Sequence, residues 1–133
     1  KLKTHEHINR SALMDVHLDT RLQSGHTTTV DAIWSGIPVL VWPARSMVSR
    51  AAAGIVMGAG MAWAIARTGD DYVDLARRIA RKAAALKEEI VEVRTTSALF
   101  DLEAWVRDFE TALRLAFEAR CFEAASCRAD LIR

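Results

Sequence analysis

Hydrophobic positions in the first half of the chain follow two different periods. Residues 13–19 alternate between apolar and polar side chains, which predicts a short strand. Residues 27–35 carry apolar side chains at helical spacing, and Gly36 is a natural stop for that helix. Residues 37–42 are continuously apolar, which is typical of a strand buried on both faces of a parallel sheet. Pro38 lies near the start of this run, where a missing N–H is tolerated.

Helical patterns dominate the second half of the chain. Residues 46–57 predict a helix that ends in a glycine-containing turn, and the alanine-rich residues 61–66 predict another short strand. Asp70 or Asp71 is the expected N-cap of a long helix, rich in Ala, Leu, Lys, Arg and Glu, that runs to about Arg94.

A second long helix is predicted over residues 102–125, and the sequence makes no prediction for residues 126–133. Its apolar side chains share one stripe, which we expect to be buried in the core. The stripe contains Trp105, Phe109, Ala112, Leu113 and Ala116.

The order of these elements predicts an α/β fold. Strands that alternate with helices form right-handed βαβ units and a parallel sheet, and here two long helices follow. Three strands make a thin sheet for such a fold. The chain also starts at Lys1, without an initiator Met or an apolar signal segment. We therefore expect it to be a piece of a longer protein that begins partway through a domain.

Composition and charge exclude several classes of protein. With 51% hydrophobic residues among 133, the chain has enough apolar surface to fold, which excludes disorder as its main state. Its 18 Lys and Arg against 17 Asp and Glu leave a net charge of +1, without the basic excess that phosphate-based binding of nucleic acid requires. No apolar run approaches the ~20 residues of a membrane helix. Two cysteines near the C-terminus, Cys121 and Cys127, disfavour a disulfide scaffold or a structural zinc site.

The most informative segment is Gly-His-Thr-Thr-Thr-Val-Asp, residues 25–31, which follows a predicted strand and opens a predicted helix. The first turn of a helix presents unpaired N–H groups and a positive dipole end, so His26 and the threonines form a seat for a phosphate or diphosphate. Asp31 lies about one turn further, where a carboxylate can bind a ribose diol. The alternative is structural: Thr27 merely caps the helix and His26 is a loop residue. A P-loop is excluded here, because no Gly-rich turn and no following Lys are present.

Three other clusters have weaker functional interpretations. His5 and His7 lack the spacing of two metal ligands on one helix face, whereas His7 and Arg10 share a face and can reach a base. Asp15 and Asp19 can be read as the acid and base of glycoside hydrolysis, or as residues that bind a loop. Basic and acidic side chains along the helix at residues 70–94 predict a solvated surface rather than a nucleic-acid site. These are Arg77, Arg78, Arg81 and Lys82, with Glu88, Glu89 and Glu92 further along.

Residues 13–20 and 25–39 together resemble the nucleotide-binding half of the O-GlcNAc transferases, glycosyltransferase family 41. The combination Leu-Asp-Thr and then Gly-His-Thr-Thr-x-x-Asp-x-x-Trp-x-Gly is specific. The likeness continues through residues 49–52, then Tyr72 and Leu75, then residues 97–101, and covers about His7 to Glu118.

This resemblance implies a GT-B fold of two Rossmann-like halves. Residues 1–133 would be a partial nucleotide-sugar-binding domain from the C-terminal half: an incomplete parallel sheet followed by two long C-terminal helices. Family members transfer N-acetylglucosamine from UDP-GlcNAc to protein Ser or Thr hydroxyls with inversion, without an essential metal or other cofactor. The implied partners are UDP-GlcNAc, protein acceptors, an N-terminal catalytic half and tetratricopeptide repeats, with no nucleic acid and no membrane. The implied location is cytoplasmic, or nuclear in a eukaryote.

The resemblance also implies binding roles, residue by residue. His26, Thr27 and Thr28 would hold the diphosphate, and Asp31 the ribose hydroxyls. His7 and Arg10 would flank the uracil. No catalytic residue and no metal ligand is carried over, and we expect the isolated chain to be inactive.

The sequence departs from the family pattern at three places. Thr4 stands where the family has a lysine, with Lys3 one residue out of register, and Pro43-Ala44 replaces a Pro-Gly pair. The pattern is also lost after Phe117. Two alternatives stay open. One is the related GDP-fucose protein O-fucosyltransferase branch, in which the position of His26 is usually Thr or Gly and that of Asp31 is usually Glu. The other is a non-catalytic interaction module on the same scaffold.

Overall fold

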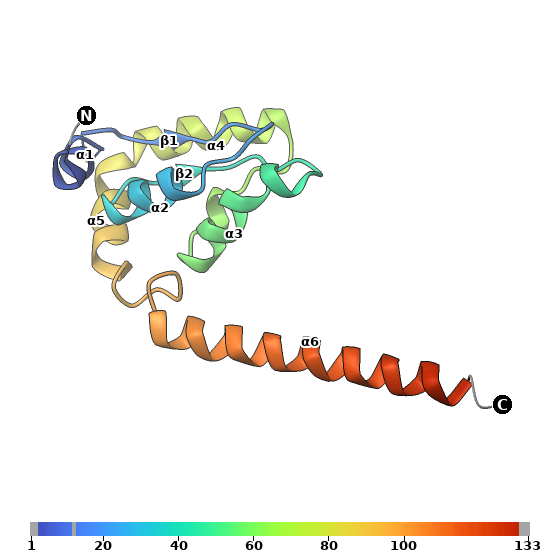
Figure 1. The fold of residues 1–133 in the computed structure, drawn as a ribbon. Coiled ribbons are helices and arrows are strands. Elements are labelled where there is room, and N and C mark those ends of the chain that lie inside the picture. Colours follow the sequence, from blue (N-terminus) through green and yellow to red (C-terminus); the bar gives the residue numbers. More distant parts are fainter. Residues whose placement is uncertain (1–2, 12, 131–133) are drawn as a thin grey trace. The chain divides into compact units, whose positions relative to one another are not determined.

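The computed structural model describes residues 3–11 and 13–130 of the chain. They divide into two compact units, Lys1–Phe100 and Asp101–Arg133. The first unit holds a small parallel sheet with helices, and the second consists mainly of one helix (Figure 1). The elements in chain order are α1 (Thr4–Ser11), β1 (His17–Leu18), α2 (Thr27–Trp34), β2 (Val39–Leu40), the 3-10 helix η1 (Met47–Ser49), α3 (Ala51–Gly58), the 3-10 helix η2 (Ala62–Ala64), α4 (Gly69–Arg81), α5 (Ala83–Val93) and α6 (Leu102–Asp130).

The sheet is parallel, as the alternation of strands and helices predicts. β1 pairs with β2 in the register His17 with Val39 and Leu18 with Leu40. Val41 forms a further parallel bridge with Ile65. The sheet is therefore very short, and its carboxyl ends lie at the loops that follow β1, β2 and Ile65.

All three predicted strands are shorter than the sequence pattern indicates, and within residues 37–42 only Val39, Leu40 and Val41 are paired. Pairing of β1 begins only at His17, whose N–H donates to the Pro38 carbonyl over 2.9 Å, and Leu13 is 82% exposed. The partner strand cannot extend further back, because Gly36 turns the chain with φ +81° just before it. In the alanine-rich segment 61–66, η2 precedes a single bridging residue, Ile65.

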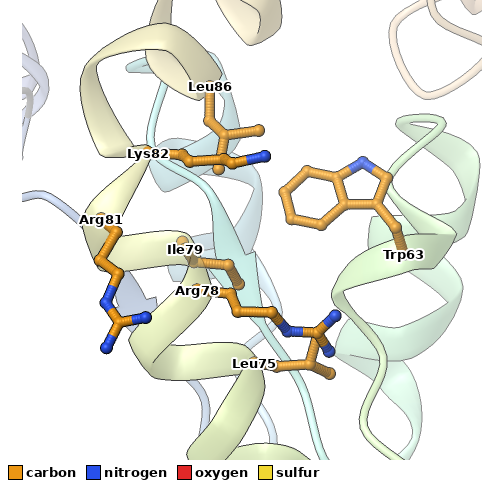
Figure 2. A pocket seen from close by; sticks show the side chains of 7 residues that line it. All are labelled: Trp63, Leu75, Arg78, Ile79, Arg81, Lys82 and Leu86. Carbon is orange, nitrogen blue, oxygen red and sulfur yellow. The ribbon is translucent and has the colours of Figure 1, made fainter.

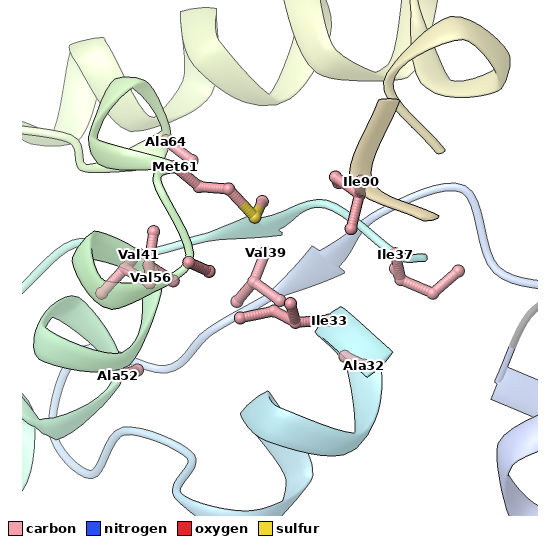
Figure 3. Close-up of a cluster of buried hydrophobic side chains, with 11 residues drawn as sticks. Ala32, Ile33, Ile37, Val39, Val41, Ala52, Val56, Met61, Ala64 and Ile90 are labelled. Carbon is pink, nitrogen blue, oxygen red and sulfur yellow. The ribbon is translucent and has the colours of Figure 1, made fainter. Parts of the chain in front are cut away.

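Apolar residues on both faces of β2 are buried, as expected for a central strand. On one face, Val39 and Val41 pack with Ile33 of α2 and Val56 of α3 (Figure 3). On the other face, Leu40 packs against α4, in a cluster completed by Ala66, Leu75 and Ile79. The alternation of side chains along an extended strand thus fixes one helical layer on each side.

The helix predicted over residues 27–35 is confirmed by α2, which ends at Trp34 before Gly36. The helix predicted over 46–57 is interrupted: η1 ends before Arg50, and α3 begins only at Ala51. The N-cap predicted at Asp70 or Asp71 is wrong by two or three residues. Thr68 caps α4, because its hydroxyl accepts from the Asp71 N–H over 3.1 Å.

The helix predicted to run without a break to Arg94 is divided at Lys82, so three helices rather than two follow the sheet. Lys82 has φ −115° and ψ 14°, outside the helical region. The division lets Ile79 of α4 and Ile90 of α5 join different apolar clusters. Helix propensity alone cannot predict it, because every residue near the break favours a helix.

α6 confirms the long terminal helix, but its apolar stripe is not buried. Trp105, Phe109 and Leu113 are each about half exposed, so the prediction of a core stripe is wrong for this chain. The rings of Trp105 and Phe109 stack on each other, with centroids 5.0 Å apart. Cys121 is exposed, and the side chain of Cys127 lies outside the described part. None of the helices in residues 3–11 and 13–130 combines the length and apolar character needed to cross a bilayer.

Candidate functional site

The loop between β1 and α2 leaves the carboxyl end of β1, where ligands of parallel α/β sheets bind. Asp19, 7% exposed, fixes this loop by three hydrogen bonds, one each to β2, to α4 and to the far end of the loop. Its N–H donates to the Leu40 carbonyl over 2.9 Å, and its own carbonyl accepts from the Tyr72 hydroxyl over 2.9 Å. Its carboxylate accepts from the Gly25 N–H over 2.7 Å. The strand end thereby fixes the chain that enters α2.

Asp19 therefore binds a loop, which is the structural alternative that the sequence left open against a role in glycoside hydrolysis. Asp15, the other carboxylate of that hypothesis, is exposed. The phenol of Tyr72 is part-buried, and this burial together with the Asp19 charge raises the pKa of Tyr72. The sequence gives no local signal for the contact between Tyr72 and Asp19, because the two residues are 53 positions apart.

Ser24 ties the same loop to the segment after β2. Its N–H and its hydroxyl both donate to the Val48 carbonyl, over 3.0 and 2.8 Å. Its hydroxyl oxygen also accepts from the Ala52 N–H at the start of α3, over 3.2 Å. Ser24 is 4% exposed, so these bonds are shielded from water. The sequence analysis missed this residue, because a serine in a polar loop carries no pattern of its own.

Gly25 is required by close packing against α2. A Cβ at this position would lie 2.6 Å from Oγ1 of Thr29 and 2.7 Å from Oγ1 of Thr28. Both distances are too short for any Cβ, so a side chain at residue 25 would displace the first turn of the helix. Thr29 is fully buried, and its Oγ1 has no hydrogen-bond partner among the residues that the structure describes.

His26 is the N-cap of α2, with φ −115° and ψ −89°. Its carbonyl accepts from the Thr29 and Val30 N–H groups, each over 3.1 Å. His26 rather than Thr27 occupies the N-cap position and its side chain makes no capping bond, so the helix cap predicted at Thr27 is wrong. The side chains of His26, Thr27 and Thr28 are all exposed at this turn. Three polar side chains and the positive helix end are thus available to an anion.

A hollow of about 420 Å³ lies beside this turn. It is lined by the end of β1 and by the loop, with polar side chains from Asp19, Gln23, Ser24 and Thr28. Arg21 belongs to the same loop, and its guanidinium lies 4.0 Å from the centre of the Trp42 ring. The hollow has the size and polarity of a site for a small polar ligand.

His7 and Asp31, predicted to lie near a nucleoside, contact each other. His7 Nε2 is 3.6 Å from Asp31 Oδ2, and both side chains are about one-third exposed. α1 packs against α2, and the Ser35 hydroxyl donates to the Ile8 carbonyl over 3.3 Å. Arg10 lies in the last turn of α1, exposed and three residues after His7. The structure therefore brings His7 into contact with Asp31. Within the described part of the chain, the Arg10 side chain forms no hydrogen bond or ion pair.

Metal binding receives no geometric support from the described residues, since no three His, Cys, Asp or Glu side chains converge among them. His5 is exposed, and His7 is directed at Asp31. One residue before the family lysine position, which Thr4 occupies, the backbone N–H of Lys3 donates to the Glu6 carboxylate over 2.8 Å.

Residues 2–109, which span α1 to α5 and the start of α6, match the sequence model described as glycosyl transferase family 41. The chain belongs to this family. A family 41 relative from Caenorhabditis elegans, named UDP-N-acetylglucosamine--peptide N-acetylglucosaminyltransferase, is 37% identical over 81% of the chain and 10% of its own length. A probable enzyme of the same name from Arabidopsis thaliana is 35% identical over 87% of the chain and 12% of its own length.

A solved structure of a mutant O-GlcNAc transferase from Thermobaculum terrenum superposes with a TM-score of 0.82 and 27% identity. The match covers 92% of this chain and 24% of that one. These findings confirm the resemblance read from residues 25–39 and the expected α/β fold of an incomplete GT-B half. This chain spans about a tenth of the length of the curated relatives named here and about a quarter of that solved structure.

Proposed function

We propose that this chain supplies the donor-binding part of a protein O-GlcNAc transferase. In this proposal, N-acetylglucosamine passes from UDP-GlcNAc to a Ser or Thr hydroxyl of a protein acceptor, with inversion at the anomeric carbon. The observation that carries the proposal is the first turn of α2. His26, Thr27 and Thr28 stand exposed there, at the carboxyl end of β1 and beside an open polar hollow.

The diphosphate would bind at this turn. The first N–H groups of α2 have no partner within the helix, and they point in the same direction as the positive dipole end. Thr27 and Thr28 add hydroxyl donors. The bonds of Asp19 and Ser24 keep the loop in place before the ligand arrives, so little ordering entropy is lost on binding.

The nucleoside would bind toward α1. The Asp31 carboxylate is one turn along α2 from the diphosphate seat and can accept bonds from the ribose hydroxyls. The His7 imidazole, 3.6 Å from this carboxylate, would lie beside the base, and Arg10 would approach it from the next turn of α1.

In this proposal, these residues stabilise the leaving group of the reaction, UDP. As the bond from the sugar to UDP breaks, negative charge accumulates on the β-phosphate. Without a metal, oriented N–H groups, hydroxyls and the His26 imidazole must stabilise this charge, with His26 acting as a cation or as a neutral donor. The acceptor site and the remaining machinery are proposed to lie in an N-terminal half, with tetratricopeptide repeats selecting acceptors.

Two alternatives are distinguished by ligand preference. GDP-fucose would be the donor if the chain belonged to the fucosyltransferase branch, but His26 and Asp31 favour UDP-GlcNAc. No nucleotide would bind if the scaffold served only as an interaction module, a reading supported by Thr4 in place of the family lysine.

The test is ligand-observed NMR of the protein with UDP, UDP-GlcNAc, GDP and GDP-fucose, with His26→Ala and Asp31→Ala variants measured alongside. His5→Ala is the matched control, because His5 is an exposed histidine of α1 without an assigned role. We expect uridine-selective binding that weakens in both site variants and persists in the control.

Each other result leads to a different conclusion. Selectivity for GDP and GDP-fucose would replace UDP-GlcNAc by the fucosyl donor. Absence of binding by a protein that still unfolds cooperatively would favour the interaction module. Equal weakening in the His5→Ala control would mean that the site is not at the start of α2.

A further inference from the structure

A second hollow lies where α4 meets α5, away from the loop that follows β1. It has a volume of about 380 Å³ and is lined by Trp63, Leu75, Arg78, Ile79, Arg81, Lys82 and Leu86 (Figure 2). We propose that this hollow binds an acidic peptide segment that carries one large apolar side chain. The proposal is independent of the donor site.

The hollow lies at the edge of the sheet opposite to the proposed donor site. Trp63 belongs to η2, which immediately precedes the strand residue Ile65 and therefore lies at the amino end of the sheet. α4 starts just after the carboxyl end of that strand and runs back along the sheet, so its last turn reaches the same amino end. An occupant here would leave the start of α2 free.

The floor of the hollow is apolar and rigid. Leu75 and Ile79 are 9% and 2% exposed and belong to the cluster that packs under Leu40. Figure 2 shows the Trp63 indole facing Lys82 and Leu86 across the opening. Trp63 is 41% exposed although it borders this floor. A large apolar side chain inserted here would cover both the floor and the indole.

The rim of the hollow is cationic. Arg78, Arg81 and Lys82 are exposed, and none of them forms an ion pair within the described part of the chain. Arg77, their neighbour on the same helix, is instead paired with Asp74 over 3.2 Å.

Two of the three acidic residues in the first turns of α4 already have partners. The Asp71 carboxylate accepts from the Arg67 N–H over 2.8 Å, and the Asp74 carboxylate is bound by Arg77. Three positive charges thus gather on a chain whose net charge is only +1. The surface predicted to be solvated is exposed, and its last turn in α4 carries basic side chains that form no ion pair in the described part of the chain.

This combination favours a peptide over other anions. The volume is at the lower end of the ~300–1,000 Å³ of small-ligand pockets, so it admits one large side chain rather than an extended ligand. Tryptophan and arginine are the residues most enriched among the energetically dominant contacts of protein interfaces. Carboxylates on either side of the apolar anchor would meet the three cations and speed its association. A flat bilayer surface could not reach the concave floor, and nucleic acid would need a longer basic track.

The test measures fluorescence anisotropy of a labelled peptide in which one phenylalanine is flanked on each side by two acidic residues. The control peptide carries the corresponding amides. The protein variants are the Arg78→Gln with Arg81→Gln double variant and Trp63→Phe, with Arg77→Gln as matched control. These substitutions are at exposed positions and keep the fold; Trp63→Phe also keeps an aromatic ring.

We expect the acidic peptide to bind, and the amide peptide to bind at least tenfold more weakly. The double variant should lose at least tenfold in affinity and Trp63→Phe should lose several-fold, whereas Arg77→Gln should bind like the unchanged protein. UDP binding should be the same in all of these variants, which separates this proposal from the donor site.

Three results would overturn the proposal. The first is that the acidic and amide peptides bind equally well, or that neither peptide binds. The second is an equal loss in Arg77→Gln and in the double variant. The third is binding to phosphatidylserine vesicles that the double variant abolishes while the peptide does not bind, which would assign the hollow to a lipid surface.

Discussion

The Asp19 carboxylate accepts a 2.7 Å hydrogen bond from the N–H of Gly25, and this contact closes the loop between β1 and α2. Asp19→Ala would leave that part-buried N–H without its acceptor, so we expect a loss of about 1–3 kcal/mol in the free energy of unfolding. UDP affinity should fall as well, because the start of α2 is no longer held. Urea unfolding and ligand titration measure the two effects. Asp15→Ala, at an exposed carboxylate of the same segment, should change the stability by less than about 0.5 kcal/mol.

Two glycines, one packed against α2 and one in the interior of α3, allow the effect of an added Cβ to be compared. Gly25→Ala would place a Cβ within 2.7 Å of two threonine oxygens, and we expect a destabilisation of about 1–3 kcal/mol together with weaker UDP binding. Gly54→Ala adds a Cβ to the interior of α3, where no other atom lies within 4 Å. It should stabilise the protein by about 0.5–1 kcal/mol. Thermal and urea unfolding measure both variants. The packing explanation would be refuted if the two substitutions changed the free energy of unfolding in the same direction.

The buried hydroxyl of Thr29 lacks a hydrogen-bond partner, so its removal should be favourable. Thr29→Val keeps the shape of the side chain, and we expect the free energy of unfolding to rise by about 1 kcal/mol. Thr28→Val, at the neighbouring exposed hydroxyl, should leave stability nearly unchanged and weaken UDP binding instead. A Thr29→Val variant less stable than the unchanged protein would mean that this hydroxyl has a partner in solution.

Tyr72 makes stability depend on pH in the alkaline range. Burial and then the Asp19 charge raise the pKa of Tyr72 above its usual value of about 10. The folded state therefore retains the phenolic proton longer than the unfolded state does. This contribution to stability is complete below about pH 10 and is lost as the pH rises through the folded pKa. Tyr72→Phe should lower stability by about 0.5–1.5 kcal/mol at neutral pH, through loss of the bond to the Asp19 carbonyl. Urea unfolding at several pH values should show that the difference in stability between Tyr72→Phe and the unchanged protein shrinks above pH 10. A difference that stayed constant would contradict the raised pKa of Tyr72.

The sequence predicts best where one local pattern has one physical cause. α2 could be predicted to within a residue, because its apolar spacing is followed by Gly36, whose φ of +81° suits only glycine. The burial of β2 on both faces follows equally from its uninterrupted apolar run. The extent of β1 could not be predicted, because it depends on where the partner strand begins after Pro38.

The same distinction applies to the site. The helix start on which the proposed anion seat rests was predictable from residues 25–31, because a helix start presents the same N–H groups in every protein. The contacts that hold it were not predictable, since Ser24 reaches Val48 and Ala52 and Asp19 meets Tyr72 across long stretches of sequence. The break at Lys82 was equally hidden, because only tertiary packing separates α4 from α5.

One hydroxyl group links the proposed ligand loop to α3. The Ser24 oxygen accepts from the Ala52 N–H, so this amide can exchange its hydrogen with solvent only when the loop moves away from the helix. Amide exchange at Ala52 therefore reports loop opening from a position outside the ligand site. If the loop is the diphosphate seat, saturating UDP should slow this exchange, while exchange at buried amides of α4 should keep its rate.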